Sequence, residues 1–516
     1  MSLPEELHVN KFLLPSHCIG ACSHLLCPLI TMPRDIRLLN LGSDSAERDI
    51  TVGLSEYFYQ NSTYQKFFNS GKTILVGNRG AGKSAIFKYM AAVEARKGNL
   101  VIELSPEEYS YELLSQYLRS EQEGSWGKQS SYSVAWQYLL YNLIFKRIVE
   151  EKRGLLLGAQ KDVYTYVQNT LQNQNLNSIG ILFSYLKRLE EIKLSSYESI
   201  QKTHELQALY SLEEIKDLLP SLRRILEKTR IKVFVDELDK GWDNSEDAKY
   251  FLAGLFQAAQ KLNLISPNLR IYISIRQELF DNIPQIYDDA QKIREDVEVI
   301  RWRKAELLEL IGLRIAHSFP DLQDLSGLRR WNSIFALEIP SHQAESVDYI
   351  LDRTQLRPRE LLQFCKLCVE YYCEGKRIDE CTILAAEEVF SEQKIKDLAS
   401  EYRFQYPHLL DIFEVFRGRK SHFGKEELEY LLLATVCGEL DVDRAANWVL
   451  EMDYLELKKL LWHIGFIKAK IPRPAGQSAP TNVVYLGHYE LPTINLENVE
   501  SFCIHPAFCS FLSLKH

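Results

Sequence analysis

The chain has 516 residues, of which 46% are hydrophobic and 25% are charged, and its formal net charge is −9. This is ordinary globular usage, which excludes a disordered chain as the default and favours about three domains. The net charge excludes a surface that is basic throughout, but it leaves room for a local basic patch.

Neither a membrane segment nor a disulfide framework is evident in the sequence. No run of 18 apolar residues occurs, so we expect no membrane partner. The ten cysteines lack framework spacing, which favours free thiols and a cytoplasmic location. Cys365, Cys368, Cys373 and Cys381 lie close together, and the first two are predicted on one face of a buried helix. We expect reduced core cysteines here, with a metal or redox site as the alternative.

The first half of the chain alternates helices with short apolar strands. Residues 1–40 are expected to form a loosely ordered N-terminal extension. A helix is predicted between about Ala46 and Phe68, and others from Ala85 and over residues 247–262. β-Branched and apolar runs predict four buried strands, over residues 73–76, 99–106, 231–238 and 269–276.

A helical segment is predicted between the second and third strands. Residues from about 109 to 226 carry helical periodicity with almost no strand signal. Strands that alternate with helices predict a mostly parallel sheet with helices on both faces. We therefore expect an α/β core over residues 41–302, with a large helical insertion at about 109–226.

The segment GNRGAGKS follows the first strand and precedes a helix. It matches G-x-x-x-x-G-K-[ST], the pattern of a phosphate-binding P-loop. Its glycines allow a tight turn that brings backbone N–H groups toward phosphate oxygens, and the helix start adds positive charge. The predicted nucleotide-binding residues are Gly77, Asn78, Arg79, Gly80, Ala81, Gly82, Lys83, Ser84 and Ala85.

Carboxylates directly follow the third strand, in VFVDELDKGW. We predict that Lys83 contacts the β- and γ-phosphates of ATP and that Ser84 ligates Mg²⁺. Asp236 is then predicted to hold Mg²⁺ through water, and Glu237 to polarise the attacking water. Asp239 has three open interpretations: a contact with a sensor residue, a contact with a neighbouring subunit, or the start of a turn.

Several arginines are candidates for contacts with the nucleotide. Ser274 and Arg276 end the fourth strand, where a polar side chain would lie beside the γ-phosphate. Arg276 could stabilise the charge that develops during phosphoryl transfer, within its own subunit or across to a neighbour, and Arg294 is the second candidate. Arg357 and Arg359 begin a later helix, from which an arginine can reach back over the nucleotide, and we count Arg359 among the nucleotide-binding residues. Ordinary surface or ion-paired arginines are the alternative in each case.

The second half of the chain is predicted to be mostly helical. Residues 303–405 are expected to form a helical lid. Residues 406–516 follow the order helix, strand, loop, strand, which is typical of a winged helix. Basic side chains there could meet nucleic-acid phosphates, or form a solvated face: Arg417, Arg419, Lys420, Lys425, Lys458, Lys459, Lys468, Lys470 and Arg473.

The order of these motifs resembles the bacterial P-loop ATPases of the STAND and AAA-like group, with KAP NTPases as more distant relatives. The resemblance rests on LGSDSAERD, ILVGNRGAGKSAIFKYMA, VFVDELDKGWDNSED, IYISIRQELFDNI, IREDVEVIRW and LDRTQLRPRELLQFC, over roughly residues 42–368. It implies a P-loop NTPase core with a helical lid and a winged-helix-like domain that binds ATP and Mg²⁺ through Walker A and Walker B motifs. KAP proteins usually carry transmembrane helices and STAND proteins long repeat sensors, and this sequence shows neither.

Three functions remain open at this stage. The first, which the resemblance implies, is an ATP-driven assembly switch: a homo-oligomer that works with a separate effector protein in an anti-phage defence system. The second is a nucleic-acid-binding ATPase that uses the C-terminal winged helix. The third is an ATP-binding module without turnover, which the Asp-Glu pair argues against, because that pair is typical of hydrolytic sites.

Overall fold

The computed structural model describes residues 34–105, 127–151, 157–171, 212–239, 245–281, 290–440, 444–472 and 483–515. The chain divides into two compact units, residues 1–35 and 36–516. Ile36, Leu39 and Leu41 are buried in the core of the second unit. The end of the extension expected over residues 1–40 therefore lies within the second unit, where these apolar side chains pack against helices of the C-terminal half. Within the described ranges, no helix has the length and apolar content needed to span a membrane.

The first half of the second unit is the α/β core. Its elements are η1 (Ile36–Leu38), α1 (Ala46–Val52), α2 (Leu54–Tyr57), α3 (Ser62–Ser70), β1 (Ile74–Val76), α4 (Lys83–Arg96), β2 (Leu100–Leu104), α6 (Gly127–Glu151), α7 (Ala159–Leu171), α10 (Glu213–Leu226), β3 (Ile231–Val235), α11 (Glu246–Asn263), β4 (Leu269–Ile275), α12 (Gln277–Asp281), α13 (Ala290–Asp296) and β5 (Val297–Val299). The described parts of the predicted insertion, α6, α7 and α10, are helical.

The core is built on a five-stranded sheet in the order β2-β3-β4-β1-β5. All four neighbouring pairs are parallel, for example Ile74 beside Ile273 and beside Val297. The prediction of a parallel sheet is confirmed. The fifth strand, β5, was not predicted, because its three residues are all partly exposed and give no continuous apolar run.

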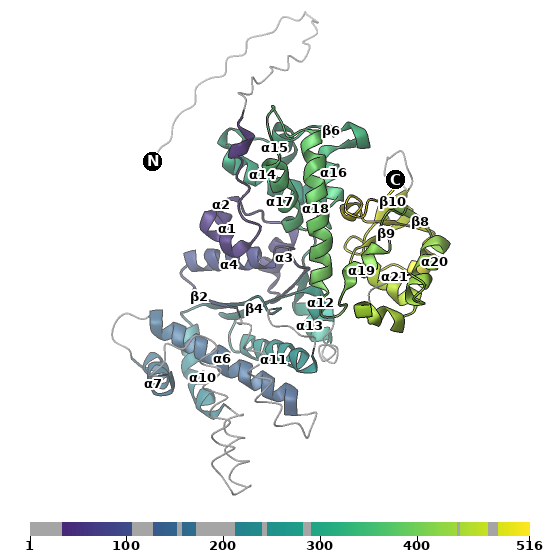
Figure 1. Cartoon of the computed structure of the whole chain (residues 1–516). Helices are drawn as coiled ribbons and strands as arrows, with labels where there is room; N and C mark the ends of the chain where they lie inside the picture. The colour runs from purple at the N-terminus through teal and green to yellow at the C-terminus, as the bar shows by residue number, and fades with distance from the viewer. Residues whose placement is uncertain are drawn as a thin grey trace, which may run out of the picture. The chain divides into compact units, whose positions relative to one another are not determined.

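Helices cover both faces of this sheet (Figure 1). Successive side chains in a strand point to opposite faces. Val76, Val233 and Ile273 accordingly pack in one cluster with α6 and α11, whereas Leu75 and Phe234 pack in another with α3 and α4. The sheet is therefore buried on both sides, as its apolar runs predicted.

The helix predicted between Ala46 and Phe68 is instead three short helices. Gly53 ends α1 with a φ of 139°, a conformation that glycine adopts readily. Asn61 caps α3, because its side chain accepts a hydrogen bond from the backbone N–H of Tyr64. The intervening break brings Tyr57, Phe58 and Tyr59 to the wall of the main cavity.

The second half of the unit is mostly helical. Its first part contains α14 (Lys304–Ser318), η3 (Pro320–Leu322), α15 (Gly327–Ile334), β6 (Glu338–Ile339), η4 (Pro340–His342), β7 (Ala344–Glu345), α16 (Ser346–Asp352), α17 (Pro358–Glu370) and α18 (Glu380–Glu401). The last part contains α19 (Leu409–Glu414), β8 (His422–Gly424), α20 (Lys425–Val436), η5 (Arg444–Glu451), α21 (Tyr454–His463), β9 (Ile467–Pro472), β10 (Val483–Leu486), η6 (Leu496–Asn498), β11 (Ser501–Ile504) and η7 (Pro506–Phe508).

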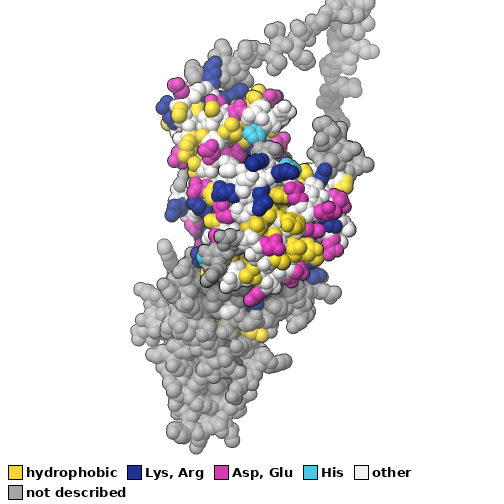
Figure 2. Space-filling view, turned by 45° about the vertical axis from the view of Figure 1, so that its right-hand side comes forward, with side chains coloured by type: hydrophobic (Ala, Val, Ile, Leu, Met, Phe, Trp, Pro, Cys, Tyr) yellow, Lys and Arg dark blue, Asp and Glu magenta, His cyan; other side chains and the backbone are white. Residues whose placement is uncertain are grey.

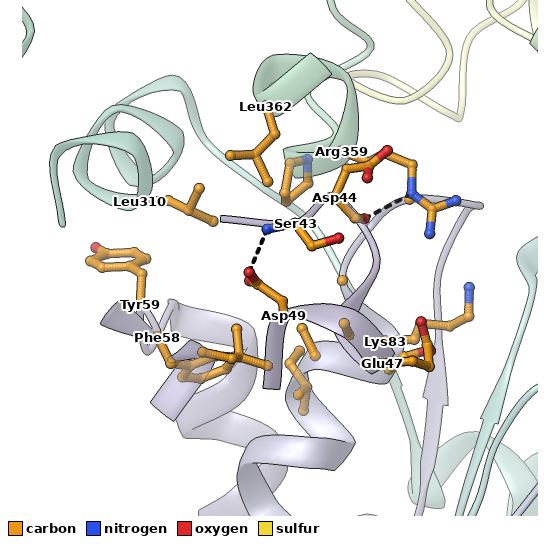
Figure 3. A pocket seen from close by; sticks show the side chains of 18 of the residues that line it. Ser43, Asp44, Glu47, Asp49, Phe58, Tyr59, Lys83, Leu310, Arg359 and Leu362 are labelled. Carbon is orange, nitrogen blue, oxygen red and sulfur yellow. Dashed lines mark hydrogen bonds between the residues drawn. The ribbon is translucent and has the colours of Figure 1, made fainter. Parts of the chain in front are cut away.

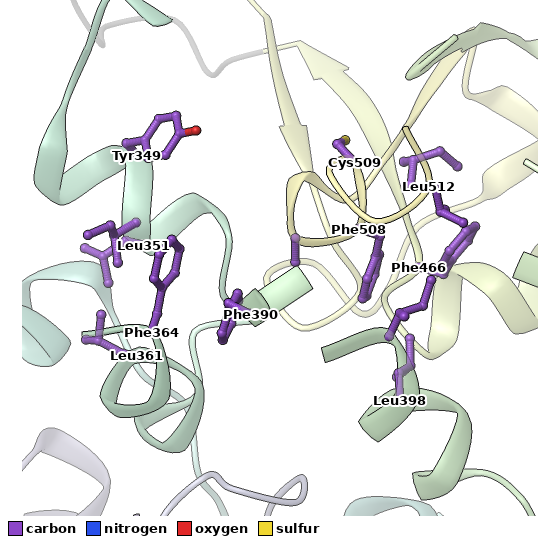
Figure 4. Packing of buried hydrophobic residues seen from close by; sticks show 14 of the residues in the cluster. Tyr349, Leu351, Leu361, Phe364, Phe390, Leu398, Phe466, Phe508, Cys509 and Leu512 are labelled. Atoms are coloured by element: carbon purple, nitrogen blue, oxygen red, sulfur yellow. The ribbon is translucent and has the colours of Figure 1, made fainter. Parts of the chain in front are cut away.

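These two parts, predicted as separate domains that meet at residue 405, share one hydrophobic core. Phe364 stacks on Phe390 of α18, and Phe466 stacks on Phe508. All four belong to one buried cluster, which Figure 4 shows in section. The hydroxyl of Ser391 on α18 also accepts a hydrogen bond from the backbone N–H of Phe511. The two parts are therefore joined along α18.

The last part contains a four-stranded antiparallel sheet in the order β10-β9-β11-β8. The helices α20 and α21 follow β8 in sequence, and β9 follows α21. Strand β8 was not predicted, because it has only three residues, two of them exposed. The predicted loop over residues 472–482 lies almost entirely outside the described residues.

Two histidines of this last part lead us to expect a loss of stability in acid. Burial lowers the pKa of His488 and His505, and that of His488 falls from 6.5 to about 4. Between these pH values the unfolded chain binds protons that the folded chain does not. We therefore expect the free energy of unfolding, measured by urea titration, to fall as the pH is lowered from about 6.5 toward 4. His488→Gln should reduce this dependence. If the free energy of unfolding fell equally with pH in wild type and in His488→Gln, the lowered pKa would not belong to His488.

Candidate functional site

The P-loop joins β1 to α4 across the carboxyl edge of the sheet. Gly80 and Gly82 have φ angles of +78° and +96°, which residues with a side chain rarely adopt. The loop is thereby turned so that α4 begins at Lys83. A tight loop that leads into a helix N-terminus is a site for anions.

Lys83 is bonded to the loop that precedes it. Its Nζ donates to the carbonyl oxygens of Gly77, at 2.9 Å, and Asn78, at 3.2 Å. Burial lowers the pKa of Lys83, and the nearby carboxylate of Asp236 opposes that shift. The lysine is therefore held at the mouth of the loop, beside the carboxylate from the third strand.

Three oxygen-bearing side chains from three elements meet at Asp236. This residue directly follows β3 and accepts hydrogen bonds from the hydroxyls of Ser84 on α4 and Ser274 on β4. The backbone N–H of Glu237 donates to Asp236 Oδ1 at 2.9 Å. Burial raises the pKa of Asp236, whereas these hydrogen bonds and Lys83 lower it. The Ser84 hydroxyl and the Asp236 carboxylate together offer oxygen ligands that fit Mg²⁺, which prefers oxygen ligands and retains waters.

Glu237 has an unusual backbone conformation. Its φ of +59° places a non-glycine residue in the left-handed region, which costs about 1–2 kcal/mol. Such strain persists where the surrounding structure imposes it, and it is frequent at functional sites. Glu237 lines the same cavity as Lys83, Ser84 and Asp236.

Asp239 forms an ion pair with Arg276. The guanidinium of Arg276 contacts the carboxylate of Asp239 directly, and its Nη1 lies 3.5 Å from Glu278 Oε1. Both Asp239 and Arg276 line the cavity. Of the three interpretations of Asp239, the structure thus favours contact with the residue at the tip of the next strand.

The cavity itself has a volume of about 250 Å³ and two chemically different ends. The polar end carries Lys83, Ser84, Asp236 and Glu237. The other end is mainly apolar and aromatic, and Figure 3 shows Phe58, Tyr59, Leu310 and Leu362 around it. A nucleotide would match these two ends, with its flat aromatic base at the apolar end and its phosphates at the P-loop.

The N-terminal segment that precedes the P-loop also lines this cavity. It contributes Ser43, Asp44, Glu47 and Asp49, and Asp49 accepts from the backbone N–H of Ser43 at 2.6 Å. No role was predicted for these residues or for the apolar end. They lie in the LGSDSAERD segment, on which the resemblance partly rests, but only tertiary packing brings that segment to the P-loop.

The two lid arginines have different positions. Arg359 lines the cavity, its backbone N–H donates to Gly80 O at 3.3 Å, and its Nε donates to Asp44 O at 3.2 Å. Arg357 is buried, with its Nη1 2.9 Å from Glu401 Oε2 and 3.3 Å from Arg79 O. Arg359 is therefore placed for contact with a ligand, and Arg357 connects the P-loop to the end of α18.

Arg294 lies outside this constellation. It is exposed on α13 and does not line the cavity. A role for Arg294 in the site of a neighbouring subunit stays a prediction.

The four clustered cysteines and two of the basic residues of the C-terminal part have the following positions. Cys365 and Cys368 are free and fully buried on α17, as predicted for core thiols, while Cys373 and Cys381 are exposed. Lys458 and Lys468 are buried, with Nζ 2.5 Å from Glu429 Oε1 and 3.4 Å from Glu490 Oε2 respectively. The expectation that these two lysines present charge to nucleic acid is wrong, because both are already paired inside the fold.

Gly80→Ala should weaken nucleotide binding. A Cβ at Gly80 would lie 3.0 Å from Arg359 Cβ, in addition to the cost of a positive φ. We expect about tenfold lower affinity, which corresponds to about 1.4 kcal/mol, in titrations with a fluorescent ATP analogue. Gly71→Ala is the matched control, because Gly71 has a φ of +74° and no atom within 4 Å of the added Cβ. Equal affinities in the two variants would show that the contact with Arg359 is unimportant.

Comparisons with known proteins give matches of three kinds: a family model, a relative by sequence and solved structures. Residues 305–399 match the family described as the FunZ-associated C-terminal helical domain. A putative transposon gamma-delta 80.3 kDa protein of Escherichia coli K12 is 24% identical over 494 residues, which cover 92% of this chain and 67% of that protein. The solved structure of the Aeropyrum pernix ORC2 protein, in ADPNP-ADP complexes, is 10% identical with a TM-score of 0.33, covering 86% of this chain and 90% of that one. A TM-score this low supports neither a shared fold nor a shared function.

Proposed function

We propose that this protein binds and hydrolyses ATP with Mg²⁺ in the cavity beneath α17. The observation that carries the proposal is the meeting of Lys83, Ser84 and Asp236 at one end of a cavity whose other end is apolar. In this proposal the end of β3 supplies the acids, and the P-loop supplies backbone amides for the phosphates. Ser84 and Asp236 would hold Mg²⁺, which would neutralise charge on the β- and γ-phosphates.

The remaining steps fall to side chains already near the loop. Lys83 stabilises negative charge on the terminal phosphates, and Glu237 orients and polarises the attacking water. Arg276 is the candidate for charge stabilisation within the same chain, since Asp239 and Glu278 hold its guanidinium at the cavity. Asp239 acts on this chemistry through Arg276 and is therefore a positioning residue.

Hydrolysis is proposed to drive a change in the arrangement of the helical lid. Support comes from Arg359 and Arg357, which bond the P-loop carbonyls of Gly80 and Arg79 from the start of α17. Loss of the γ-phosphate would alter these contacts first. A homo-oligomer, a separate effector protein and a role in anti-phage defence rest on the resemblance alone and stay predictions.

Phosphate release with ATP tests the proposal. Wild-type protein should release phosphate from ATP in the presence of Mg²⁺, and release should stop when the metal is chelated. A parallel assay with GTP shows which nucleotide is preferred. Lys83→Ala should lower both hydrolysis and nucleotide affinity, because the variant lacks the cation at the loop. Binding of ATP that is unaffected by Lys83→Ala would contradict this site.

A second candidate is an ATPase that acts on nucleic acid. Its support is the element order of the last part, which we propose to be a winged helix, and the exposed lysines Lys459 on α21 and Lys470 on β9. The similarity to a putative transposon protein of Escherichia coli is a further reason to test DNA binding. Binding of labelled duplex DNA should weaken with salt and with Lys459→Glu combined with Lys470→Glu. Lys261→Glu is the control, because Lys261 is exposed on α11 of the core. DNA binding that does not change with salt concentration would exclude a nucleic-acid-binding ATPase.

A further inference from the structure

The helix α20 is apolar on two opposite sides. Its inner side buries Leu428, Leu431 and Leu432 in the shared core. On its outer side Tyr430 and Leu433 are 71% and 44% exposed. A surface helix of a folded protein normally has one apolar stripe and one polar face, and a helix that is apolar all round is normally covered on both sides.

The outer side forms one continuous stripe, which we call the outer patch: Tyr430, Leu433, Cys437 and Leu450. The first three follow the spacing i, i+3, i+7, which places them in one row along the helix and its C-terminal turn. Leu450 on η5 is 53% exposed, and its Cδ2 lies 3.6 Å from the Cβ position at Gly438, directly after Cys437. Figure 2 turns the C-terminal part forward and shows hydrophobic side chains gathered there with acidic ones beside them.

Acidic side chains border the outer patch. Glu426 and Glu427 lie four and three residues before Tyr430, on the same side of α20, and both are exposed. Glu439 and Glu451 are exposed beside Cys437 and Leu450. The positive charge of Lys458, on the neighbouring helix, is buried against Glu429 and does not offset this border. Lys420 lies 3.9 Å from Glu427, and such an exposed pair is worth little.

We propose that the outer patch binds a basic amphipathic helix of a partner protein. Such a helix would pack its apolar stripe on Tyr430 and Leu433 and place lysines or arginines against the glutamates. The acidic border opposes nucleic acid, whose phosphates it would repel. Residues 1–35 of this chain are a poor occupant, because they carry three acids (Glu5, Glu6, Asp35) against two bases (Lys11, Arg34). The inference does not depend on ATP hydrolysis, since it concerns residues outside the cavity.

Two designed helical peptides of about 18 residues test this surface in the full-length protein. Both carry leucines at positions i, i+3, i+4 and i+7, and one has lysine and arginine elsewhere while its twin has glutamate. Fluorescence anisotropy should show at least about tenfold tighter binding of the basic peptide, with weakening at high salt. Tyr430→Ser combined with Leu433→Ser should abolish binding, whereas Glu426→Lys combined with Glu427→Lys should shift preference toward the acidic twin.

The controls separate this surface from the rest of the molecule. Leu264→Ser removes an 86% exposed leucine at the end of α11 and should leave peptide binding unchanged. ATP hydrolysis and the thermal unfolding temperature should be unchanged in the Glu426 and Glu427 variant. Equal binding of the two peptides, competition by duplex DNA, or a change in sedimentation that shows self-association through Tyr430 would each overturn the proposal.

Discussion

Glu237→Gln is expected to reduce ATP hydrolysis by at least about a hundredfold while nucleotide affinity stays within about twofold of wild type. The reason is chemical: a glutamine keeps the size of the side chain but cannot accept a proton from the attacking water, and such general-base catalysis contributes about 10²–10⁴-fold. Binding depends on Lys83 and the loop, which the change leaves in place. Phosphate release and titration with a fluorescent ATP analogue measure the two effects separately.

The separation of the two effects is what distinguishes catalysis from folding. A misfolded variant would lose binding as well as turnover. Glu227→Gln is the matched control, because Glu227 is exposed at the end of α10 and does not line the cavity. Unchanged hydrolysis in Glu237→Gln would assign the base to another residue and favour a cavity that binds nucleotide without this chemistry.

Asp49→Ala is expected to destabilise the fold by about 3–5 kcal/mol, because it leaves a buried guanidinium without its partner. Asp49 and Arg314 are 1% and 6% exposed, and Asp49 Oδ2 lies 2.7 Å from Arg314 Nη2. Asp49 Oδ1 accepts a further hydrogen bond from Tyr57 Oη at 2.8 Å. The pair ties α1 of the core to α14 of the lid, so its loss should also weaken nucleotide binding. Urea unfolding measures the first effect.

An exposed ion pair between other elements provides the comparison. Lys304 Nζ lies 2.5 Å from Asp352 Oδ1, with both side chains more than two-fifths exposed. Asp352→Ala should cost at most about 1 kcal/mol, because water already solvates both charges. A loss of less than about 1 kcal/mol in Asp49→Ala would mean that water reaches Arg314 in the variant, contrary to its burial here.

The residues of the polar end of the cavity could be identified from the sequence because their signals are local. The P-loop is one continuous segment, and Asp236 and Glu237 stand directly after an apolar strand. The apolar end could not be predicted, because Tyr59, Leu310 and Leu362 come from three distant segments that only the packed lid brings together. Arg276 was found at the end of its strand, but its pairing with Asp239 needed the parallel register of β3 beside β4.

Two observations that the sequence did not reveal have a common physical cause. Ile36, which lies inside the expected N-terminal extension, is buried, and so are Lys458 and Lys468. In both cases a residue's burial is decided by elements remote in sequence: the lid core for Ile36, and Glu429 and Glu490 for the two lysines. Charge and hydropathy along the chain do not reveal such partners.

The helix α18 extends far from the P-loop. Its 22 residues span about 33 Å, and its last residue, Glu401, is bonded to Arg357, which touches the P-loop. If a helix of this length tilted by about 5° about its Glu401 end, its other end would move by about 3 Å. Because residues of the C-terminal part pack against α18 in the shared core, we expect a rotation of this helix to displace them as well.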